Sequence, residues 1–142
     1  MNLPTVIVDT NVVVAGLITK DPKATVCQIL DAMLSGRLPY LLSADLLNEY
    51  AQVLSRPIIS RYHDLITTEV DCLLEELTAN AIWREPSISE DAPDPGDNHL
   101  WSLLKTQHGV ILVTGGQLLV KNPPADASVL IPKHFFELFM RL

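Results

Sequence analysis

Cysteine is scarce in this sequence: Cys27 and Cys72 are the only two among 142 residues. Each lies in an apolar segment with helical spacing, where a thiol packs as a small hydrophobic group. We therefore expect two buried free thiols, and neither a disulfide nor a metal site with cysteine ligands.

Basic residues are outnumbered by acidic ones. The chain has 10 Lys and Arg against 17 Asp and Glu, which gives a net charge of −7 and an isoelectric point of about 4.9. That sign is unfavourable for non-specific binding to nucleic acid, because lysine and arginine neutralise the phosphates. It does not exclude a nuclease, since a bound metal ion can reverse the local charge.

Long apolar runs are missing as well. No stretch of 18 apolar residues is present, and the chain does not begin with the basic segment of a secretion signal. Hydrophobic residues make up 48% of the chain and charged residues 19%, as in globular proteins and not in disordered ones. We expect a single domain over residues 1–142 and a soluble, cytoplasmic protein.

The segment that organises the rest of the chain covers residues 5–11, Thr-Val-Ile-Val-Asp-Thr-Asn. A short run of β-branched residues that ends in a polar cluster is typical of a buried parallel strand. Asp9 then lies at the carboxyl end of that strand, which is the edge where ligands bind in open α/β sheets. A carboxylate is costly there unless it is paired, for example with a divalent cation.

Apolar segments along the rest of the chain alternate between strand and helix patterns. Further strands are expected at residues 38–42, 81–84, 110–113 and 129–131. Helices are expected at residues 12–18, 26–34, 46–54, 68–80 and 100–104, and from Pro132 onward. Residues 58–65 are expected to be a connector, and residues 85–98 an acidic loop that contains neither Lys nor Arg. This alternation predicts a three-layer α/β/α sandwich with a mostly parallel sheet of about five strands.

Three carboxylates are expected at one edge of this sheet. Asp9 ends the first strand, Glu49 lies in the first turns after the second strand, and Asp97 opens the helix before the fourth. Asp97 reaches the same edge if the acidic loop folds over it. Carboxylates on one rim repel each other and favour a bound cation, and all-oxygen ligands suit Mg²⁺ or Mn²⁺. Such ions can activate water for attack on a phosphodiester.

Four segments, taken in order, resemble the PIN domain, the fold of VapC-type toxin ribonucleases and related nucleases. They are Val-Ile-Val-Asp9-Thr-Asn11, Leu-Leu-Asn-Glu49-Tyr, Asp94-Pro-Gly-Asp97-Asn98 and Leu-Val-Thr114-Gly115. The ending Val-Leu-Ile-Pro-Lys-His-Phe135 also resembles the tail of one branch of these toxins. The resemblance covers nearly the whole chain.

This resemblance implies metal-dependent cleavage of single-stranded RNA, with Asp9, Glu49 and Asp97 as the catalytic metal ligands. The polar residues expected beside these ligands are Asn11, Asp94, Asn98 and Thr114. The family usually has a fourth Asp after the Thr-Gly pair, where this chain has Gly116. One expected ligand is therefore absent, which implies a weakened site.

Simpler roles remain open for the acidic residues. Asp9 and Asp97 could each cap the helix that follows, and capping can coexist with metal binding. Glu49 could be a solvated helix residue. Asp94 could position the loop or offer a replacement oxygen to the metal.

Simpler roles also remain open for the uncharged polar residues. Asn11 could be a turn residue or could orient Asp9, and Thr114 could satisfy backbone groups at a strand end. The four histidines are scattered and need no special role, although His99 lies near the expected site.

Three functions are compatible with these patterns. The first is a Mg²⁺- or Mn²⁺-dependent ribonuclease, the toxin of a toxin–antitoxin pair, with an antitoxin protein as partner. The second is a non-catalytic PIN-fold module that binds RNA or a protein, which Gly116 favours. A phosphatase with an aspartyl nucleophile ranks last, because Asn11 stands where such an enzyme has a second Asp. We also expect a homodimer or larger assembly, from the family and from the apolar segment 12–18 and the Phe-rich C-terminal segment.

Overall fold

The computed structural model describes residues 3–141, and its strands are short and parallel. The strands are β1 (Val6–Val8), β2 (Leu41–Leu42), β3 (Ile82–Trp83), β4 (Ile111–Val113) and β5 (Ser128–Leu130). They form one sheet in the order β1-β4-β5 and a smaller sheet of β2 and β3. A parallel bridge between Val6 and Tyr40 joins the two sheets, and Val6 N donates to the carbonyl of Pro39 at 3.0 Å. The predicted parallel arrangement is confirmed.

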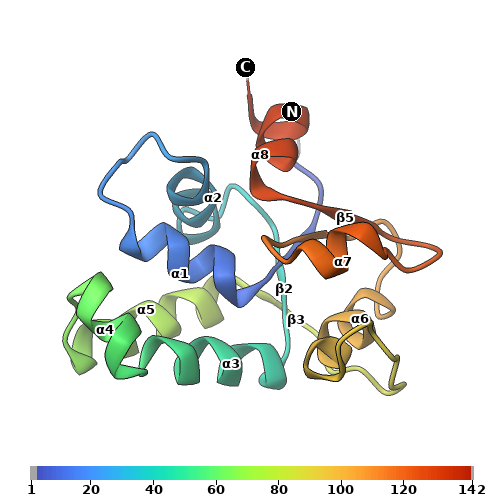
Figure 1. The fold of residues 1–142 in the computed structure, drawn as a ribbon, viewed down its shortest axis with the longest axis horizontal. Helices are drawn as coiled ribbons and strands as arrows, with labels where there is room; N and C mark the ends of the chain where they lie inside the picture. The colour runs from blue at the N-terminus through green and yellow to red at the C-terminus, as the bar shows by residue number, and fades with distance from the viewer. Residues whose placement is uncertain (1–2, 142) are drawn as a thin grey trace.

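Helices cover both sides of these strands, which confirms the predicted α/β architecture (Figure 1). The α-helices are α1 (Thr10–Ile18), α2 (Thr25–Leu34), α3 (Ala44–Leu54), α4 (Pro57–His63), α5 (Thr67–Asn80), α6 (Asn98–Leu104), α7 (Gln117–Lys121) and α8 (Pro132–Phe135). A 3₁₀ turn over Pro95–Asp97 precedes α6, and a π-helical turn over Phe136–Met140 follows α8. In Figure 1, α1 to α5 lie on the left of the strands, and α6 and α7 lie on the right.

Short polar signals set the ends of several helices as the sequence predicts. Ser43 caps α3, because its hydroxyl accepts a hydrogen bond from Leu46 N at 3.2 Å. Gly36 follows α2 with a φ of +78°, a conformation that glycine adopts without strain. These caps fix where β2 and α3 begin, and therefore where Glu49 lies.

The core is built on β1, all of whose residues are fully buried. Phe135 of α8 is also fully buried and packs against the tilted ring of Phe139 with ring centroids 5.1 Å apart, so the aromatic C-terminal segment contributes to the core. Gly16 allows α1 and α2 to approach closely, because a Cβ there would lie 2.9 Å from the carbonyl oxygen of Val26. The close contact fixes α1, whose first residue follows Asp9.

Two segments differ from the expected secondary structure. Most of the predicted connector at residues 58–65 is helical: α4 begins at Pro57 and ends at His63, and the next residue, Asp64, has a left-handed conformation with a φ of 58°. Proline in the first turn has a φ suited to a helix, and an Asp tolerates the left-handed region better than most residues. A further short helix, α7, directly follows Gly116.

The prediction of two buried thiols is wrong for Cys72, which is exposed, while Cys27 is half-buried. Leu73 and Leu77 form part of the apolar stripe of α5, and Cys72 falls outside this stripe. A helix presents one stripe to the core, so a neighbouring position in the sequence can face solvent.

Within residues 3–141, no helix combines the length and the apolar character that a membrane span requires.

Candidate active site

Asp9 lies at the carboxyl end of β1, and it is only 6% exposed. Its Oδ1 accepts a hydrogen bond from Thr10 N at 2.8 Å, which caps α1, and its Oδ2 accepts one from the Thr114 hydroxyl at 2.7 Å. Burial raises the pKa of Asp9, and the nearby charge of Glu49 adds to that effect, while both hydrogen bonds oppose it. Asp9 therefore caps a helix and also presents a carboxylate whose negative charge is poorly solvated.

Thr114 and Asn11 surround Asp9 with polar groups, as the resemblance implies. Thr114 is fully buried at the end of β4, next to β1 in the sheet. Asn11 Nδ2 lies 3.4 Å from Asp9 Oδ2, and its Oδ1 accepts a hydrogen bond from Gly115 N at 3.0 Å. These contacts link the loop after β4 to the start of α1, so Asn11 and Thr114 position Asp9.

Glu49 projects from α3 toward the same region. The hydroxyl of Thr10 donates a hydrogen bond to its Oε1, and His99 Nε2 lies 3.2 Å from its Oε2. The hydrogen bond with His99 is the main cause of a lowered pKa for Glu49, which burial opposes. Glu49 is thus a partly buried, ionised carboxylate that is held on both oxygens, and it is not simply a solvated helix residue.

Asp97 and Asp94 arrive from the acidic loop. Asp97 is half-buried at the start of α6, and its side chain makes no capping hydrogen bond. Burial raises its pKa to about 6, and the charges of Asp9, Asp94 and Glu49 add to this effect. Asp94 Oδ1 accepts a hydrogen bond from Gly96 N at 3.0 Å, so it shapes the turn that presents Asp97.

Asn98 lies beside Asp97 in the sequence but has a different role. Its Oδ1 accepts a hydrogen bond from Ala92 N at 2.8 Å, and its backbone carbonyl accepts one from the Ser102 hydroxyl. Asn98 lines a separate polar cavity beyond α6 and not the one that holds the other acidic side chains. It therefore folds the acidic loop back onto α6, the arrangement that Asp97 needs to reach the sheet edge.

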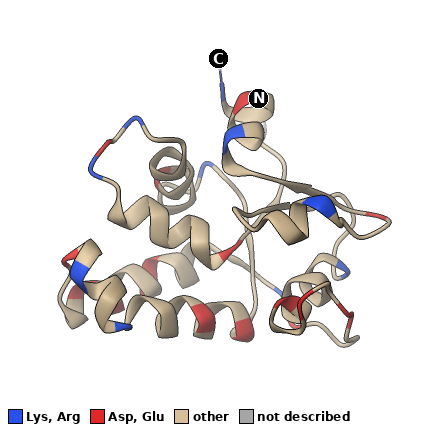
Figure 2. Ribbon diagram, viewed as in Figure 1, with Lys and Arg blue, Asp and Glu red and all other residues tan. Residues whose placement is uncertain are grey.

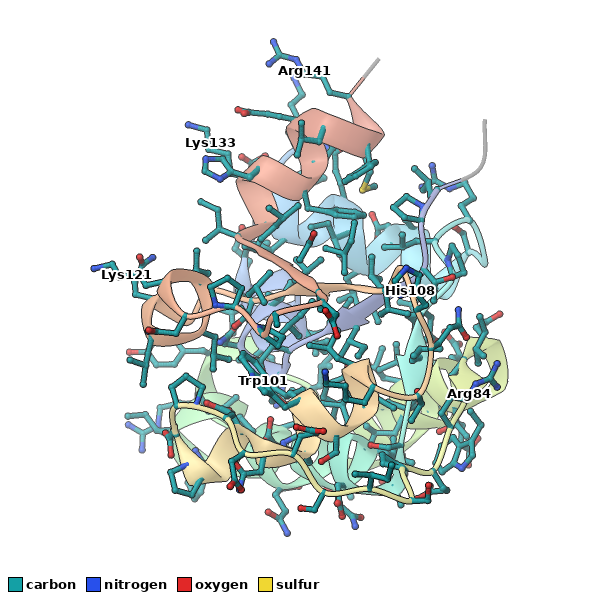
Figure 3. The ribbon with its side chains drawn as sticks, turned by 90° about the vertical axis from the view of Figure 1, so that its right-hand side faces the viewer. Arg84, Trp101, His108, Lys121, Lys133 and Arg141 are labelled. Carbon is teal, nitrogen blue, oxygen red and sulfur yellow. The ribbon has the colours of Figure 1, made fainter. Side chains whose placement is uncertain are left out.

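One open cavity of about 950 Å³ brings these residues together. Its polar lining includes Asp9, Thr10, Asn11, Glu49, Asp94, Asp97 and Gln117, while its apolar wall includes Val14, Ile18, Val26, Val53, Ile59, Leu118 and Leu119. Among the described residues that line it, Arg56 alone is basic. Acidic segments lie near the ends of α1, α3 and α6 that border this region (Figure 2), whereas Lys121, Lys133 and Arg141 extend outward from the molecule (Figure 3).

Gly116 lines the same cavity, at the position where a fourth acidic residue was expected. Its φ of −75° and ψ of 111° are open to any residue, so no conformational need for glycine exists here. A Cβ would lie 3.3 Å from the Thr114 hydroxyl oxygen and 3.8 Å from Leu119 Cδ1. A side chain at position 116 would therefore start at the rim of the site with a small adjustment of Thr114.

The donor atoms of this cavity fit a hard divalent cation by their chemistry. They are carboxylate oxygens, and the pKa values of Asp9 and Asp97 are raised chiefly by burial and further by the charges of neighbouring carboxylates, which a cation would balance. In residues 3–141, however, no group of three His, Cys, Asp or Glu is already arranged around a single point. Binding would require the carboxylates to turn toward a common centre.

Three contributors to this site were given no role from the sequence, although His99 was expected to lie near it. Thr10 bonds to Asp9 through its amide and to Glu49 through its hydroxyl, and His99 bonds to Glu49. Tyr50 is fully buried and donates to the Val8 carbonyl. Each one is within two residues of a carboxylate singled out in the sequence, and this proximity was the available signal.

Comparisons with known proteins identify a family for this chain. A family model described as the PIN domain matches residues 5–117, which is more than half of the chain. The solved structure of the T. brucei RRP44 PIN domain aligns with 95% of this chain and 80% of its own, at 13% sequence identity and a TM-score of 0.49. No curated protein matches the chain.

Proposed function

Because the chain belongs to the PIN domain family, we propose that it is a metal-dependent endoribonuclease that cleaves single-stranded RNA. PIN domains are generally nucleases. The observation that carries the proposal is the meeting of Asp9, Glu49 and Asp97, from three separate elements, on one open cavity. A cavity with acidic oxygens at one end suits a substrate whose phosphate is bound through a cation.

The side chains of Asp9, Glu49 and Asp97 would hold a Mg²⁺ or Mn²⁺ ion. When bound, this ion would activate a water molecule and neutralise charge on the phosphodiester. Thr114 keeps Asp9 oriented toward the cavity through its hydroxyl. Arg56 lines the cavity as well, where its guanidinium can donate hydrogen bonds to a substrate phosphate.

Cleavage of a fluorescent single-stranded oligoribonucleotide in the presence of Mn²⁺ tests the proposal. We expect cleavage by the wild-type protein, little by Asp9→Asn, and none with a chelator present. Asp91→Asn is the matched control, because Asp91 is exposed in the same acidic loop and does not line the cavity. Equal cleavage by the wild type and Asp9→Asn would show that the observed nuclease is not this protein.

A second candidate function is a non-catalytic module that binds RNA or a protein, and Gly116 favours it. The cavity lacks a carboxylate at that position, and the remaining ones are not arranged around a single point. This alternative predicts RNA binding that Mn²⁺ does not convert into cleavage. Measuring binding and cleavage on the same oligoribonucleotide distinguishes the two functions.

We also propose that the protein is the toxin of a toxin–antitoxin pair, with a small antitoxin protein as partner. The apolar wall of the cavity supports a protein partner, because Leu118 on that wall is 52% exposed. The test is co-expression with the product of any small reading frame directly upstream of the gene. We expect the upstream product to relieve growth inhibition caused by this protein and to co-purify with it. Neither would occur if the two proteins were not a pair.

A homodimer or larger assembly remains part of the proposal, but its structural basis changes. Val12 and Val13 in the apolar segment 12–18 are buried within the monomer, so they cannot form the contact. Ile58, Tyr62 and Leu138 are each at least 60% exposed and are the better candidates. Light scattering that detects only a 15.7 kDa species across micromolar concentrations would contradict the assembly.

A further inference from the structure

His99 is a site residue that neither helix capping nor a metal-ligand role accounts for. It lies on α6, and its side chain is 16% exposed. Its Nε2 is 3.2 Å from Glu49 Oε2, while its Nδ1 is buried without a hydrogen-bond partner in the described structure. The contact with Glu49 is therefore the polar contact that defines the orientation of the ring.

The direction of this hydrogen bond follows from the state of Glu49. A glutamate is ordinarily ionised near neutral pH, and both carboxylate oxygens of Glu49 face hydrogen-bond donors, the Thr10 hydroxyl and the His99 ring. An ionised carboxylate has no hydrogen to give, and His99 Nε2 must therefore carry the hydrogen and donate it. Charge-assisted hydrogen bonds of this kind are stronger than neutral ones.

Glu49 needs such a contact because its side chain is long and only partly buried. It is 30% exposed and lines the open cavity, and holding such a side chain in one conformation costs rotamer entropy. Thr10 donates to Oε1 from α1, and His99 donates to Oε2 from α6. Two donors from different helices restrict the carboxylate to the side of the cavity where Asp9 lies.

We infer that His99 is a positioning residue, which together with Thr10 fixes the Glu49 carboxylate beside Asp9 so that both face the same cavity. The inference rests on the proposed function, since it concerns how the proposed metal ligands are oriented. Thr10 directly follows Asp9 and its backbone amide donates to that carboxylate, so a changed side chain at Thr10 can displace Asp9 as well as free Glu49. His99 bonds to Glu49 alone and gives the cleaner test.

The test compares His99→Gln with His99→Met, two unbranched side chains of similar size. Gln keeps an N–H group at about the reach of Nε2, and Met removes it. We expect His99→Met to weaken Mn²⁺ binding by roughly ten-fold in calorimetry or Mn²⁺ electron paramagnetic resonance, and His99→Gln to remain within about three-fold of the wild type. His108→Gln is the matched control, because His108 is exposed and lines a different cavity, which contains none of the three carboxylates.

A double-mutant cycle shows whether His99 acts through Glu49. If it does, Glu49→Gln combined with His99→Met binds Mn²⁺ no more weakly than Glu49→Gln alone. Equal losses for the Gln and Met variants, or losses that add to that of Glu49→Gln, would overturn the inference. Circular dichroism checks folding, and His99→Leu replaces His99→Met if that variant does not fold.

A metal-free measurement separates failure of this inference from failure of the proposed function. The methyl resonance of Thr10 reports on Glu49, because the Thr10 hydroxyl bonds to it. We expect His99→Met to shift this resonance and His99→Gln to leave it close to the wild-type position. If the wild type binds no Mn²⁺, the metal part of the proposed function fails, while an unchanged Thr10 resonance in His99→Met would still refute the positioning role.

Discussion

The hydroxyl of Tyr50 donates a hydrogen bond to the carbonyl of Val8 at 2.5 Å, and each of these residues is adjacent in sequence to a site carboxylate. Val8 precedes Asp9 at the end of β1, and Tyr50 follows Glu49 on α3. Because both groups are buried, this bond sets the distance between the strand end and the helix. The core thus determines where the two carboxylates lie.

Replacing Tyr50 with Phe removes this bond but keeps the packing of the ring. We expect Tyr50→Phe to lower the free energy of unfolding by about 1–3 kcal/mol, because the Val8 carbonyl loses a buried donor. Urea denaturation measures the loss. Tyr62→Phe serves as the control, since Tyr62 is 60% exposed, and a Tyr50→Phe variant as stable as that control would contradict the role of the bond.

Much of the fold could be predicted because its signals are local. The Val-Ile run before Asp9 is a fully buried strand, and Ser43 and Gly36 set helix ends as expected. The carboxyl ends of parallel strands share one edge of a sheet. The approach of Asp9 and Glu49 could therefore be expected from the parallel arrangement of the strands that precede them. Asp97 also reaches the cavity, because the acidic loop folds over the edge.

The remaining features depend on tertiary contacts that no short segment encodes. His99 Nε2 meets Glu49 across 50 positions of sequence, and the pairing of Tyr50 with Val8 spans 42. The α4 and α7 helices have too few residues to show a helical period. The partial exposure of Cys27 and the exposure of Cys72 depend on which face of a helix meets the core.

The raised pKa of Asp97 predicts that this residue destabilises the folded protein at neutral pH. Its folded-state pKa of about 6 exceeds the ordinary value of 3.8, so ionisation is disfavoured in the folded state. The contribution of protonated Asp97 to the free energy of unfolding is therefore complete below pH 3.8 and is lost as pH rises through about 6. Asp97→Asn should raise the melting temperature at pH 7.5, and because Asp97 is only half-buried we expect a rise on the order of 2 °C.

The critical measurement is how the difference in melting temperature between Asp97→Asn and the wild type depends on pH. At pH 4.5 the wild-type Asp97 is largely protonated in the folded protein but mostly ionised in the unfolded chain, so the advantage of Asp97→Asn should be clearly smaller than at pH 7.5, and it should vanish below pH 3.8. Asp91→Asn controls for the loss of one negative charge from the same loop. A stabilisation by Asp97→Asn that is the same at both pH values would show that the raised pKa of Asp97 is not its cause.

Divalent metal should stabilise the folded protein, because the cation would balance the negative charges of Asp9, Glu49 and Asp97. Mn²⁺ that binds the folded state alone raises the free energy of unfolding by about 2.7 kcal/mol at one hundred times its Kd. In a domain of this size, that corresponds to a rise in melting temperature of roughly 5–10 °C. Thermal melts with and without millimolar Mn²⁺ measure it. Asp9→Ala should show little response, and an equal response in the two proteins would place the metal elsewhere.

Position 116 offers the most direct test of the site, because a carboxylate can be added there without backbone strain. The φ of Gly116 is −75°, and its Cβ would need only a small shift of the Thr114 hydroxyl, 3.3 Å away. An Asp there would also directly precede α7, where it can cap the helix. We expect Gly116→Asp to tighten Mn²⁺ binding and raise RNA cleavage, each on the order of ten-fold, because it adds an oxygen ligand at the cavity.

Gly115→Asp is the matched control for Gly116→Asp. It adds the same charge one residue earlier, where the side chain would start 3.5 Å from Asn11 Oδ1, and Gly115 does not line the cavity. A gain specific to position 116 requires a coordinating oxygen, because added negative charge alone would raise Mn²⁺ affinity in both variants. Circular dichroism verifies that both variants fold. A folded Gly116→Asp protein with unchanged Mn²⁺ affinity and no gain in cleavage would favour the non-catalytic function, because a fourth carboxylate would then add nothing to the site.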